Sequence, residues 1–219
     1  MKKIVLPVVL AGALSLGLTG CITLPTPQPT EKVVDAPAET EETEESTDIS
    51  TDATAGGVAQ PGDVIENGEW FTYTFVNYDD ASATIQARLL SSTPATPAQV
   101  DLLVAEIPQL KGYNVVLLQF EQRKIDGAEI AFDADYTSFI PATVTGQPAQ
   151  EVSVIGWDDC PSESFSKEFD AGTESITSCV VGAWVDGGDQ IGGILYTGPS
   201  ALDDNPFSQY GGEPVFLKS

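Results

Sequence analysis

The aromatic residues of this chain are confined to its C-terminal part, and this decides where a hydrophobic core can form. All 3 tryptophans, 6 tyrosines and 9 phenylalanines lie from Trp70 onward. Aromatic side chains contribute some of the largest buried areas in protein interiors. Residues 62–219 also have the usual length of one domain with one core. We therefore expect a single folded domain over 62–219.

Within this domain the apolar residues mostly alternate with polar ones, which is the period of β-strands. Asp126-Gly127 predicts a hairpin turn after the third expected strand, and Gly187-Gly188 predicts a turn after the sixth. Short strands separated by turns are typical of an antiparallel β-sandwich. The expected strands cover 69–77, 83–90, 112–122, 128–140, 151–157, 176–186, 191–198 and 213–218.

One segment has the period of a helix instead. Thr96 is suited to cap a helix and Pro97 to occupy its first position, and Pro108 ends the pattern. The apolar residues between them are spaced as on one helical face: Val100, Leu103, Val104 and Ile107. We expect one short helix between two strands.

The first residues have the parts of a secretory signal: Lys2 and Lys3, an apolar run over 4–18, and small residues before Cys21. The run is shorter than the roughly 20 apolar residues of a transmembrane helix. Residues 1–20 are therefore predicted to be removed as a signal peptide.

The tetrad LTGC at residues 18–21 resembles the lipobox of bacterial lipoproteins. This resemblance implies a diacylglyceryl group, with chains such as palmitate, on Cys21 as the first residue of the mature chain. More than one acyl chain makes membrane anchoring stable. The lipid bilayer is then a partner, and the protein lies on the extracellular face of the cell membrane. The alternative is an ordinary signal peptide with an accidental cysteine.

Residues 21–61 are rich in Thr, Pro, Glu, Asp and Ala and contain no aromatic residue. A segment of this composition cannot bury enough apolar surface to offset its ordering entropy. We expect a disordered acidic tether that spans on the order of 35 Å between the membrane and the domain.

Two cysteines remain once Cys21 is lipidated, and they lie outside the cytosol, where disulfides persist. Cys160 and Cys179 are therefore predicted to pair. Closing a loop of about twenty residues stabilises a fold by roughly 3 kcal/mol in the chain-entropy account. A zinc site is the alternative, but the chain has no histidine, so carboxylates would have to complete the ligand set.

The charge and the missing histidine exclude whole classes of function. The formal net charge of −24 repels nucleic acid, whose binding depends on Lys and Arg. Without histidine there is no Ser-His-Asp or Cys-His catalysis. We expect a protein that is not an enzyme and has no nucleic-acid partner.

Two motifs still raise catalytic alternatives. Asp158 and Asp159 follow Trp157, but neighbouring strand residues point to opposite faces, so this pair flanks one glycosidic bond only if it lies in a turn. A surface acidic turn is the preferred interpretation. Residues 164–167, SFSK, match the Ser-x-x-Lys pattern of penicillin-recognising enzymes, yet the partner motifs are missing from the sequence. We expect a solvated loop there.

Calcium is the one metal that the sequence suggests. Asp133 and Asp135 stand two apart on one face of an expected strand, after Asp126 and Glu129, and carboxylate oxygens suit Ca²⁺. Weak calcium binding at Asp133 and Asp135 is one hypothesis. The other is a hydrated acidic edge that discourages pairing with another strand.

The tryptophans Trp70, Trp157 and Trp184 are expected in the core. In immunoglobulin-like sandwiches one tryptophan packs against the disulfide, and Trp157 and Trp184 each lie near a half-cystine in sequence. Trp70 is the best candidate for an exception, as a platform for a ligand.

Several stretches together resemble a known group. YNVVLLQFEQRKIDG (113–127), CPSESFSKEFDAGTESITSC (160–179) and DNPFSQYGGEPVFLK (204–218) follow the lipobox and tether. This arrangement is similar to actinobacterial surface lipoproteins with an immunoglobulin-like domain of the secreted mycobacterial antigen type. The resemblance implies an extracellular β-sandwich of mostly uncharacterised role. Residues 70–90 depart from it, and either add strands to the sandwich or form a separate small sheet.

These features predict a membrane-anchored extracellular lipoprotein whose domain binds an envelope protein or a small ligand without catalysis. Apart from calcium, no cofactor is expected. The alternatives are a carboxylate-dependent cell-wall enzyme and a structural or chaperone-like envelope protein.

The covalent predictions have a direct test. We expect the intact mass of the native protein to show lipid on Cys21 and the loss of two hydrogens at Cys160 and Cys179. An unmodified precursor with its leader uncleaved, or free thiols at the two later cysteines, would contradict them.

Overall fold

The five-stranded sheet contains the two longest strands of the fold, β3 and β4. The structure is a computed structural model and describes residues 56–219. Neighbouring strands of this sheet pair antiparallel, in the order β2-β3-β4-β7-β6. Its members are β2 (Phe71–Val76), β3 (Ser82–Pro94), β4 (Tyr113–Gly127), β7 (Ile176–Val185) and β6 (Gln150–Glu151).

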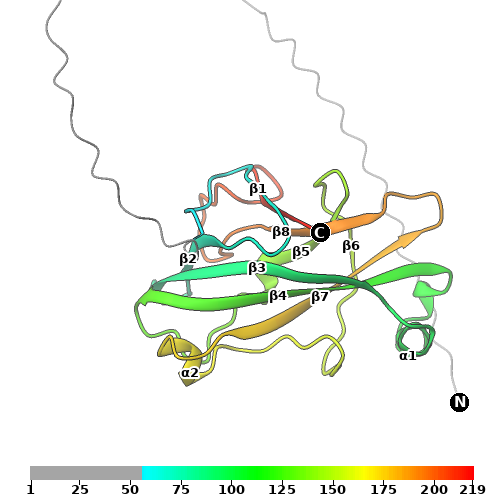
Figure 1. Cartoon of the computed structure of the whole chain (residues 1–219), viewed down its shortest axis with the longest axis horizontal. Helices are drawn as coiled ribbons and strands as arrows, with labels where there is room; N and C mark the ends of the chain where they lie inside the picture. The colour runs from blue at the N-terminus through cyan, green and yellow to red at the C-terminus, as the bar shows by residue number, and fades with distance from the viewer. Residues whose placement is uncertain (1–55) are drawn as a thin grey trace, which may run out of the picture. The chain divides into compact units, whose positions relative to one another are not determined.

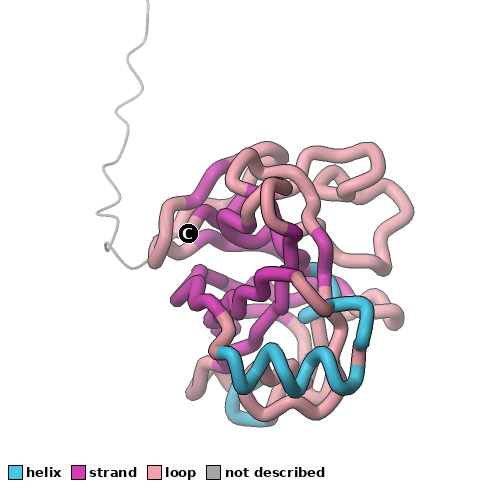
Figure 2. The backbone as a smooth tube through the Cα atoms, turned by 90° about the vertical axis from the view of Figure 1, so that its right-hand side faces the viewer, coloured by secondary structure: helices cyan, strands magenta, loops and turns pink. Residues whose placement is uncertain are grey.

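A four-stranded sheet packs against the first one (Figures 1 and 2). Its order is β1-β9-β8-β5, and only the short β1 pairs parallel with its neighbour. Its members are β1 (Val64–Ile65), β9 (Val215–Lys218), β8 (Ile191–Tyr196) and β5 (Phe139–Thr143). The predicted immunoglobulin-like antiparallel β-sandwich is thus confirmed at the level of architecture.

The main core lies between the two sheets and is built from aromatic rings. The alternation in β2 turns Phe71, Tyr73 and Phe75 inward. Tyr73 meets Tyr196 of β8 with 4.5 Å between ring centroids, and Phe120 of β4 stacks on Phe139 of β5 at 4.3 Å. Rings of both sheets therefore interdigitate, and β2 and β3 are part of the sandwich rather than a separate sheet.

A second core lies on the outer face of the five-stranded sheet. Helix α1 (Pro97–Glu106) lies against this face (Figure 2), and Leu103 of α1 packs in a cluster with Leu117 and Val181. The helix begins as predicted, because Thr96 forms a capping box with Gln99. A 3₁₀ turn, η1 (Pro108–Leu110), follows.

The disulfide between Cys160 and Cys179 is confirmed. It fastens the loop after β6 to the outer face of β7, inside the second core. Trp157 packs half-buried against this core, and Trp184 packs half-buried against the main core. Of the two, Trp157 therefore shares a cluster with the disulfide.

The expected strand over 128–140 is wrong for most of its length. Strand β4 continues to Gly127, whose φ is +107° and where a Cβ would lie 2.5 Å from the Cα of Ala83. Residues 128–135 then form a loop that leads to the 3₁₀ turn η2 (Tyr136–Ser138) and to β5 in the other sheet. No hairpin forms at Asp126-Gly127, because β4 pairs with β3 and β7 on its two sides.

Two further expectations need correction. The strand over 151–157 shrinks to β6, since only Val152 continues its pairing with β7 and Ile155 is fully exposed. The segment 164–167 is solvated only in part: Ser164 and Lys167 are exposed, whereas Phe165 is buried and stacks on Phe169 of α2 (Lys167–Asp170) at 4.5 Å. Both rings belong to the main core. They are buried although the residues around them in the sequence are polar, because segments distant along the chain pack against them.

The folded region begins before the predicted boundary at residue 61. The carbonyl of Gly57 accepts a hydrogen bond from the backbone of Thr72 (2.8 Å), and Ala59 donates to the carbonyl of Thr72 (2.8 Å). Ala59 is buried in the main core. This pairing uses backbone groups and a small side chain, which composition does not reveal. The predicted signal peptide, Cys21 and the tether up to residue 55 lie outside the described residues.

Within residues 56–219 no helix has the length and apolar character needed to cross a membrane.

The disulfide gives a prediction for stability. Replacing Cys160 and Cys179 together by serine releases a loop with a sequence separation of 19. We expect the free energy of unfolding to fall by about 3 kcal/mol, measured by urea denaturation. The variant Cys21→Ser is the matched control and should leave it unchanged. Equal urea midpoints for the double variant and the control would contradict this prediction.

Candidate functional site

Three loops meet at one end of the sandwich, at the left of Figure 1. They connect β2 to β3 (77–81), β4 to β5 (128–138) and β8 to β9 (197–214). The Asn77 side chain donates to Asp133 (2.9 Å), the Tyr78 hydroxyl lies 3.2 Å from that of Ser200, and Thr197 donates to the Ser138 carbonyl (2.7 Å). We call this region the loop end.

Three cavities open at the loop end, and Thr137 lines all of them. The largest has a volume of about 770 Å³ and is formed by the loop 197–211. The second, of about 230 Å³, lies between residues 75–78, 132–134 and 199–201. The third, of about 120 Å³, extends from Tyr136 to the disulfide. Thr137 is therefore the residue that the linings of the three cavities share.

The wall of the largest cavity is held in shape by Asn205. Its amide nitrogen donates to the carbonyls of Thr197 (2.7 Å) and Pro199 (3.3 Å), and its amide oxygen accepts from the backbone of Phe207 (3.0 Å). Phe207 in turn packs against Tyr196 of the main core, with 5.4 Å between ring centroids. The loop is therefore internally bonded and anchored to the core.

Every exposed aromatic side chain in residues 56–219 lines one of these cavities. Tyr210 is 91 % exposed at the largest, Tyr78 is 84 % and Phe132 is 71 % exposed at the second, and Tyr136 lines the third. Elsewhere on the described surface, aromatic rings are at least partly covered. An aromatic set confined to one loop-rich end is a signal of binding rather than of packing.

Phe132 is held in a backbone conformation that side chains rarely adopt, with φ +74°. Two backbone hydrogen bonds keep it there: Phe132 donates to Phe165 (2.8 Å), and Phe165 donates to Asp133 (2.7 Å). Strain of this kind costs of order 1–3 kcal/mol and clusters at ligand sites. These two backbone hydrogen bonds keep the apolar ring of Phe132 exposed to solvent.

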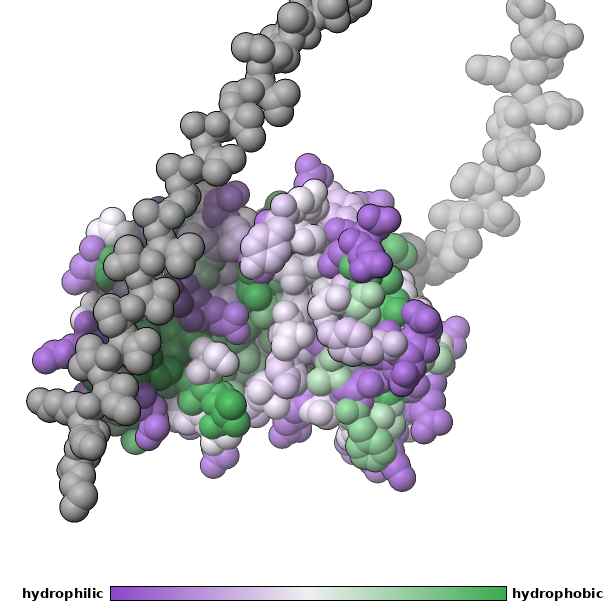
Figure 3. All heavy atoms as spheres, turned by 180° about the vertical axis from the view of Figure 1, so that it is seen from behind, coloured by the Kyte–Doolittle hydropathy of each residue, from purple (hydrophilic) through white to green (hydrophobic). Residues whose placement is uncertain are grey.

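The loop end is acidic. The side chains that line the three cavities include Asp133, Glu151, Asp203 and Asp204 but no lysine or arginine. Seen from behind in Figure 3, the described surface mixes purple and pale residues with separate green patches. The surroundings of the cavities are therefore polar and negative, with the aromatic rings set among them.

Beneath the loop end, Asp135 is buried in a polar network. It is 2 % exposed, and its carboxylate accepts hydrogen bonds from the Tyr73 hydroxyl and from the Gln122 amide (2.6 Å). Gln122 also donates to Tyr73 (2.8 Å). Burial raises the pKa of Asp135 to about 6, although both hydrogen bonds oppose this shift. Burial, with the charge of Asp135, also raises the pKa of Tyr73 well above its ordinary value.

The predicted calcium pair is not brought together. Asp133 and Asp135 lie in a loop and not on a strand. The predicted placement of their side chains on one strand face is therefore wrong. Asp135 turns into the core, whereas Asp133 faces the second cavity and accepts from Asn77. Among residues 56–219 no group of three or more Cys, Asp and Glu side chains gathers that could hold a metal. Calcium binding stays a prediction without a ligand set.

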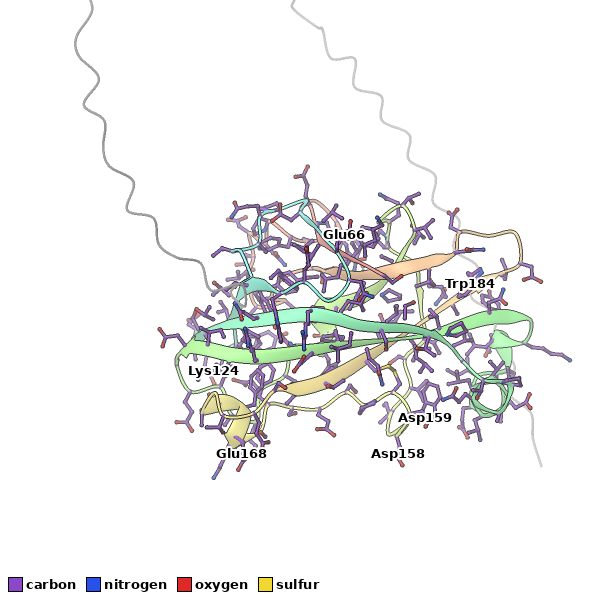
Figure 4. The ribbon with its side chains drawn as sticks, viewed as in Figure 1. Glu66, Lys124, Asp158, Asp159, Glu168 and Trp184 are labelled. Atoms are coloured by element: carbon purple, nitrogen blue, oxygen red, sulfur yellow. A yellow bond between two sulfur atoms is a disulfide. The ribbon has the colours of Figure 1, made fainter. Side chains whose placement is uncertain are left out.

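The acidic pair Asp158-Asp159 lies in a turn beside α1 (Figure 4). Asp159 accepts a hydrogen bond from the Gln99 side chain of α1 (3.0 Å), and the Asp158 side chain points away from the domain in Figure 4. The interpretation as a surface turn fits this arrangement, and the pair lines none of the loop-end cavities.

Trp70, expected in the core but also the best candidate for a ligand platform, meets the only two arginines of the chain. The guanidinium carbons of Arg88 and Arg123 lie 4.5 and 4.3 Å from the centroid of its half-buried ring. Arg88 is paired with Glu121 (2.6 Å), and Arg123 donates to Gln86 (2.9 Å). The indole is thus engaged by cations of its own sheet, which stabilises this part of the outer face.

Sequence reasoning did not place the loop-end residues in a site. Between Gly198 and Gly212 the chain is dense in Gly, Pro, Asn, Asp and Ser, which signals turns, and Tyr210 is its one tyrosine. A tyrosine in such a segment is a signal for an exposed ring, whereas Phe207 of the same segment packs against the main core. Tyr78, between Asn77 and Asp79, carries the same signal.

The chain matches no protein-family model, and no curated protein or solved structure is significantly similar to it. The resemblance to actinobacterial surface lipoproteins therefore stays a prediction.

The buried carboxylate predicts a pH dependence of stability. The pKa of Asp135 is about 6 in the folded chain and 3.8 as an ordinary value, so the folded state binds the proton more tightly. Stability gained from this group is complete below pH 3.8 and is lost as the pH rises through 6. We expect the free energy of unfolding to change by about 1 kcal/mol between pH 5 and pH 7 from this group, in favour of pH 5.

The chain has many other carboxyl groups, so the contribution of Asp135 is measured as the difference between the native chain and a variant that lacks this carboxyl group. Urea denaturation of the native chain and of Asp135→Asn at both pH values isolates the contribution of Asp135. The variant should lack this pH-dependent gain, whatever its absolute stability. Parallel pH profiles for the two proteins would contradict the assignment.

Proposed function

We propose that this protein is a non-catalytic binding protein of the cell envelope, anchored by acyl chains on Cys21, which presents its loop end to an extracellular ligand. The observation that carries the proposal is the cavity of about 770 Å³ lined by Tyr210, together with two smaller cavities that share Thr137 as a lining residue and are lined by the other exposed aromatic residues. Its volume lies in the range of ligand sites.

The loop end has the physical properties of a preformed site. The internal hydrogen bonds of Asn205 fix the cavity wall before any ligand arrives, so little ordering entropy is lost on binding. The rigid sandwich carries the loops, which is the usual division of roles in binding domains.

The edges of the two sheets are less suited than the loop end to bind a partner. The edge of β2 is covered by the segment that includes Gly57 and Ala59, and the edge of β5 is met by the hydrogen bond from Ala149 to Pro141 (2.9 Å). The edge strands β2 and β5 thus already have backbone partners, so the addition of a strand from another protein at these edges is not favoured. This supports the loop end as the binding surface.

The chemistry of the carboxylates also favours binding over catalysis. Asp135, whose pKa is raised to about 6 by burial, accepts hydrogen bonds inside the core and lines no loop-end cavity. Burial also raises the pKa of Glu151, which lines the third cavity. Asp158 and Asp159 lie beside α1, away from the cavities. The enzyme alternative would gain support if the purified protein hydrolysed envelope glycans and Asp158→Asn abolished that activity.

Site-directed photo-cross-linking in the native envelope tests the proposal. A photoreactive phenylalanine analogue at position 210 should capture a defined envelope component, because Tyr210 stands on the rim of the largest cavity. The same analogue at position 102 is the matched control, since Leu102 is 61 % exposed on α1.

We expect the captured product at position 210 and its absence at position 102. Identical product patterns at the two positions would show non-specific contact and overturn the proposed site. Products at position 102 alone would move the binding surface to α1.

A further inference from the structure

We infer that the ligand of the loop end is an uncharged saccharide of several rings. This inference rests on the proposed function and adds the chemical class of the ligand. It follows from the charge, the polar groups and the aromatic rings of the three cavities.

The charge of the loop end selects against anions. Asp203 and Asp204 line the largest cavity and Asp133 the second, and no lysine or arginine lines any of the three. An anionic polymer or lipid headgroup would meet like charge at these carboxylates, which costs affinity. One cation lies beside the second cavity, because Lys167 Nζ is 5.8 Å from the centroid of the Phe132 ring, but none lines the largest cavity. A neutral ligand avoids this cost.

The polar groups select against a purely apolar ligand. Hydroxyls of Thr137 and Ser200, the amide of Gln209 and the carboxylates of Asp203 and Asp204 all line the largest cavity. Covering such groups with hydrocarbon would leave donors and acceptors unpaired, at about 1–3 kcal/mol each. The hydroxyl groups of a sugar both donate and accept, so they can pair with carboxylates, amides and hydroxyls alike.

The aromatic rings supply the complementary apolar contact. One face of a sugar ring carries mainly C–H groups, and an aromatic face, with its negative quadrupole, packs well against them. Tyr210 is 91 % exposed and Phe132 is 71 % exposed, with Lys167 Nζ 5.8 Å from the centroid of the Phe132 ring. The hydroxyl of Tyr78 lies 3.2 Å from that of Ser200. Rings combined with hydrogen-bonding groups fit a ligand that has apolar faces and polar edges.

The placement of the rings indicates more than one sugar. Tyr210, Phe132 and Tyr136 line three different cavities that share Thr137, and they do not converge on one point. A single small cation would call for a cage of rings around one centre. Rings distributed over separate cavities that share Thr137 fit an oligomer whose successive units lie in successive cavities.

The inference is tested with the full-length protein and defined probes. Isothermal titration would measure binding of maltohexaose, cellohexaose and chitohexaose as neutral probes, of an oligogalacturonate as an anionic probe, and of hexalysine as a cationic probe. We expect at least one neutral hexasaccharide to bind and the anionic probe to fail.

Variants at position 210 report the stacking contact. Tyr210→Ala should weaken binding of the neutral probe by about tenfold, the effect of one lost ring contact. Tyr210→Phe keeps the ring and should retain affinity, and Leu102→Ala is the matched surface control and should bind like the native protein.

Each remaining outcome overturns the inference. Binding of only the anionic or the cationic probe would assign another ligand class, and failure of all neutral probes at millimolar concentration would exclude this one. If position 210 still cross-links to an envelope protein in that case, the proposed binding function stands and only the saccharide class falls. If the cross-link is also missing, both fall.

Discussion

The hydrogen bonds that Asp135 accepts from Tyr73 and Gln122 fasten the loop 128–138 to the main core, and the loop end depends on this attachment. The loop has to carry the chain from one sheet to the other. Burying a carboxylate is costly unless it is hydrogen-bonded, and here both of its oxygens have partners. The neighbours Asp133, Tyr136 and Thr137 are therefore placed by the core below them, and Phe139 enters β5 in register.

Helix α2 also holds the loop 128–138 in place, through hydrogen bonds to Asp170. Asp170 of α2 accepts hydrogen bonds from Lys124 at the end of β4 (2.6 Å) and from the backbone of Ile130 (2.9 Å). Phe165 and Phe169 stack in the core at the same helix. The loop 128–138 is thus held at its start by an ion pair and near its end by Asp135. Aromatic rings can stand exposed on it because the backbone beneath them is fixed.

The two faces of the five-stranded sheet divide the remaining tasks. The inner face provides the aromatic core, and part of the outer face is covered by α1 and by the loop that the disulfide ties to β7. Elsewhere on the outer face, Trp70 is engaged by Arg88 and Arg123. These contacts on both sheet faces serve stability, and the exposed aromatic rings of residues 56–219 gather at the loop end.

Several elements were predictable because their signals are local. The alternation of Phe71, Tyr73 and Phe75 gave β2, and the cap at Thr96 with Pro97 gave α1. The disulfide followed from the oxidising environment that the lipobox-like tetrad implies. The expected strand over 128–140 failed because Asp135 and Ile130 are buried by contacts with distant segments, which alternation along one segment does not report. Phe165 and Phe169 were missed for the same reason.

What the sequence alone determined is the set of properties that a short window contains: strands with inward rings, one capped helix, the pairing of Cys160 with Cys179, and an acidic chain without histidine. Only the tertiary structure decided that the loops around Asn77, Thr137 and Asn205 meet at one end and enclose cavities. The physical reason is that local propensity acts over a few residues, whereas a cavity exists only between segments that the packing of the two sheets brings together from far along the chain.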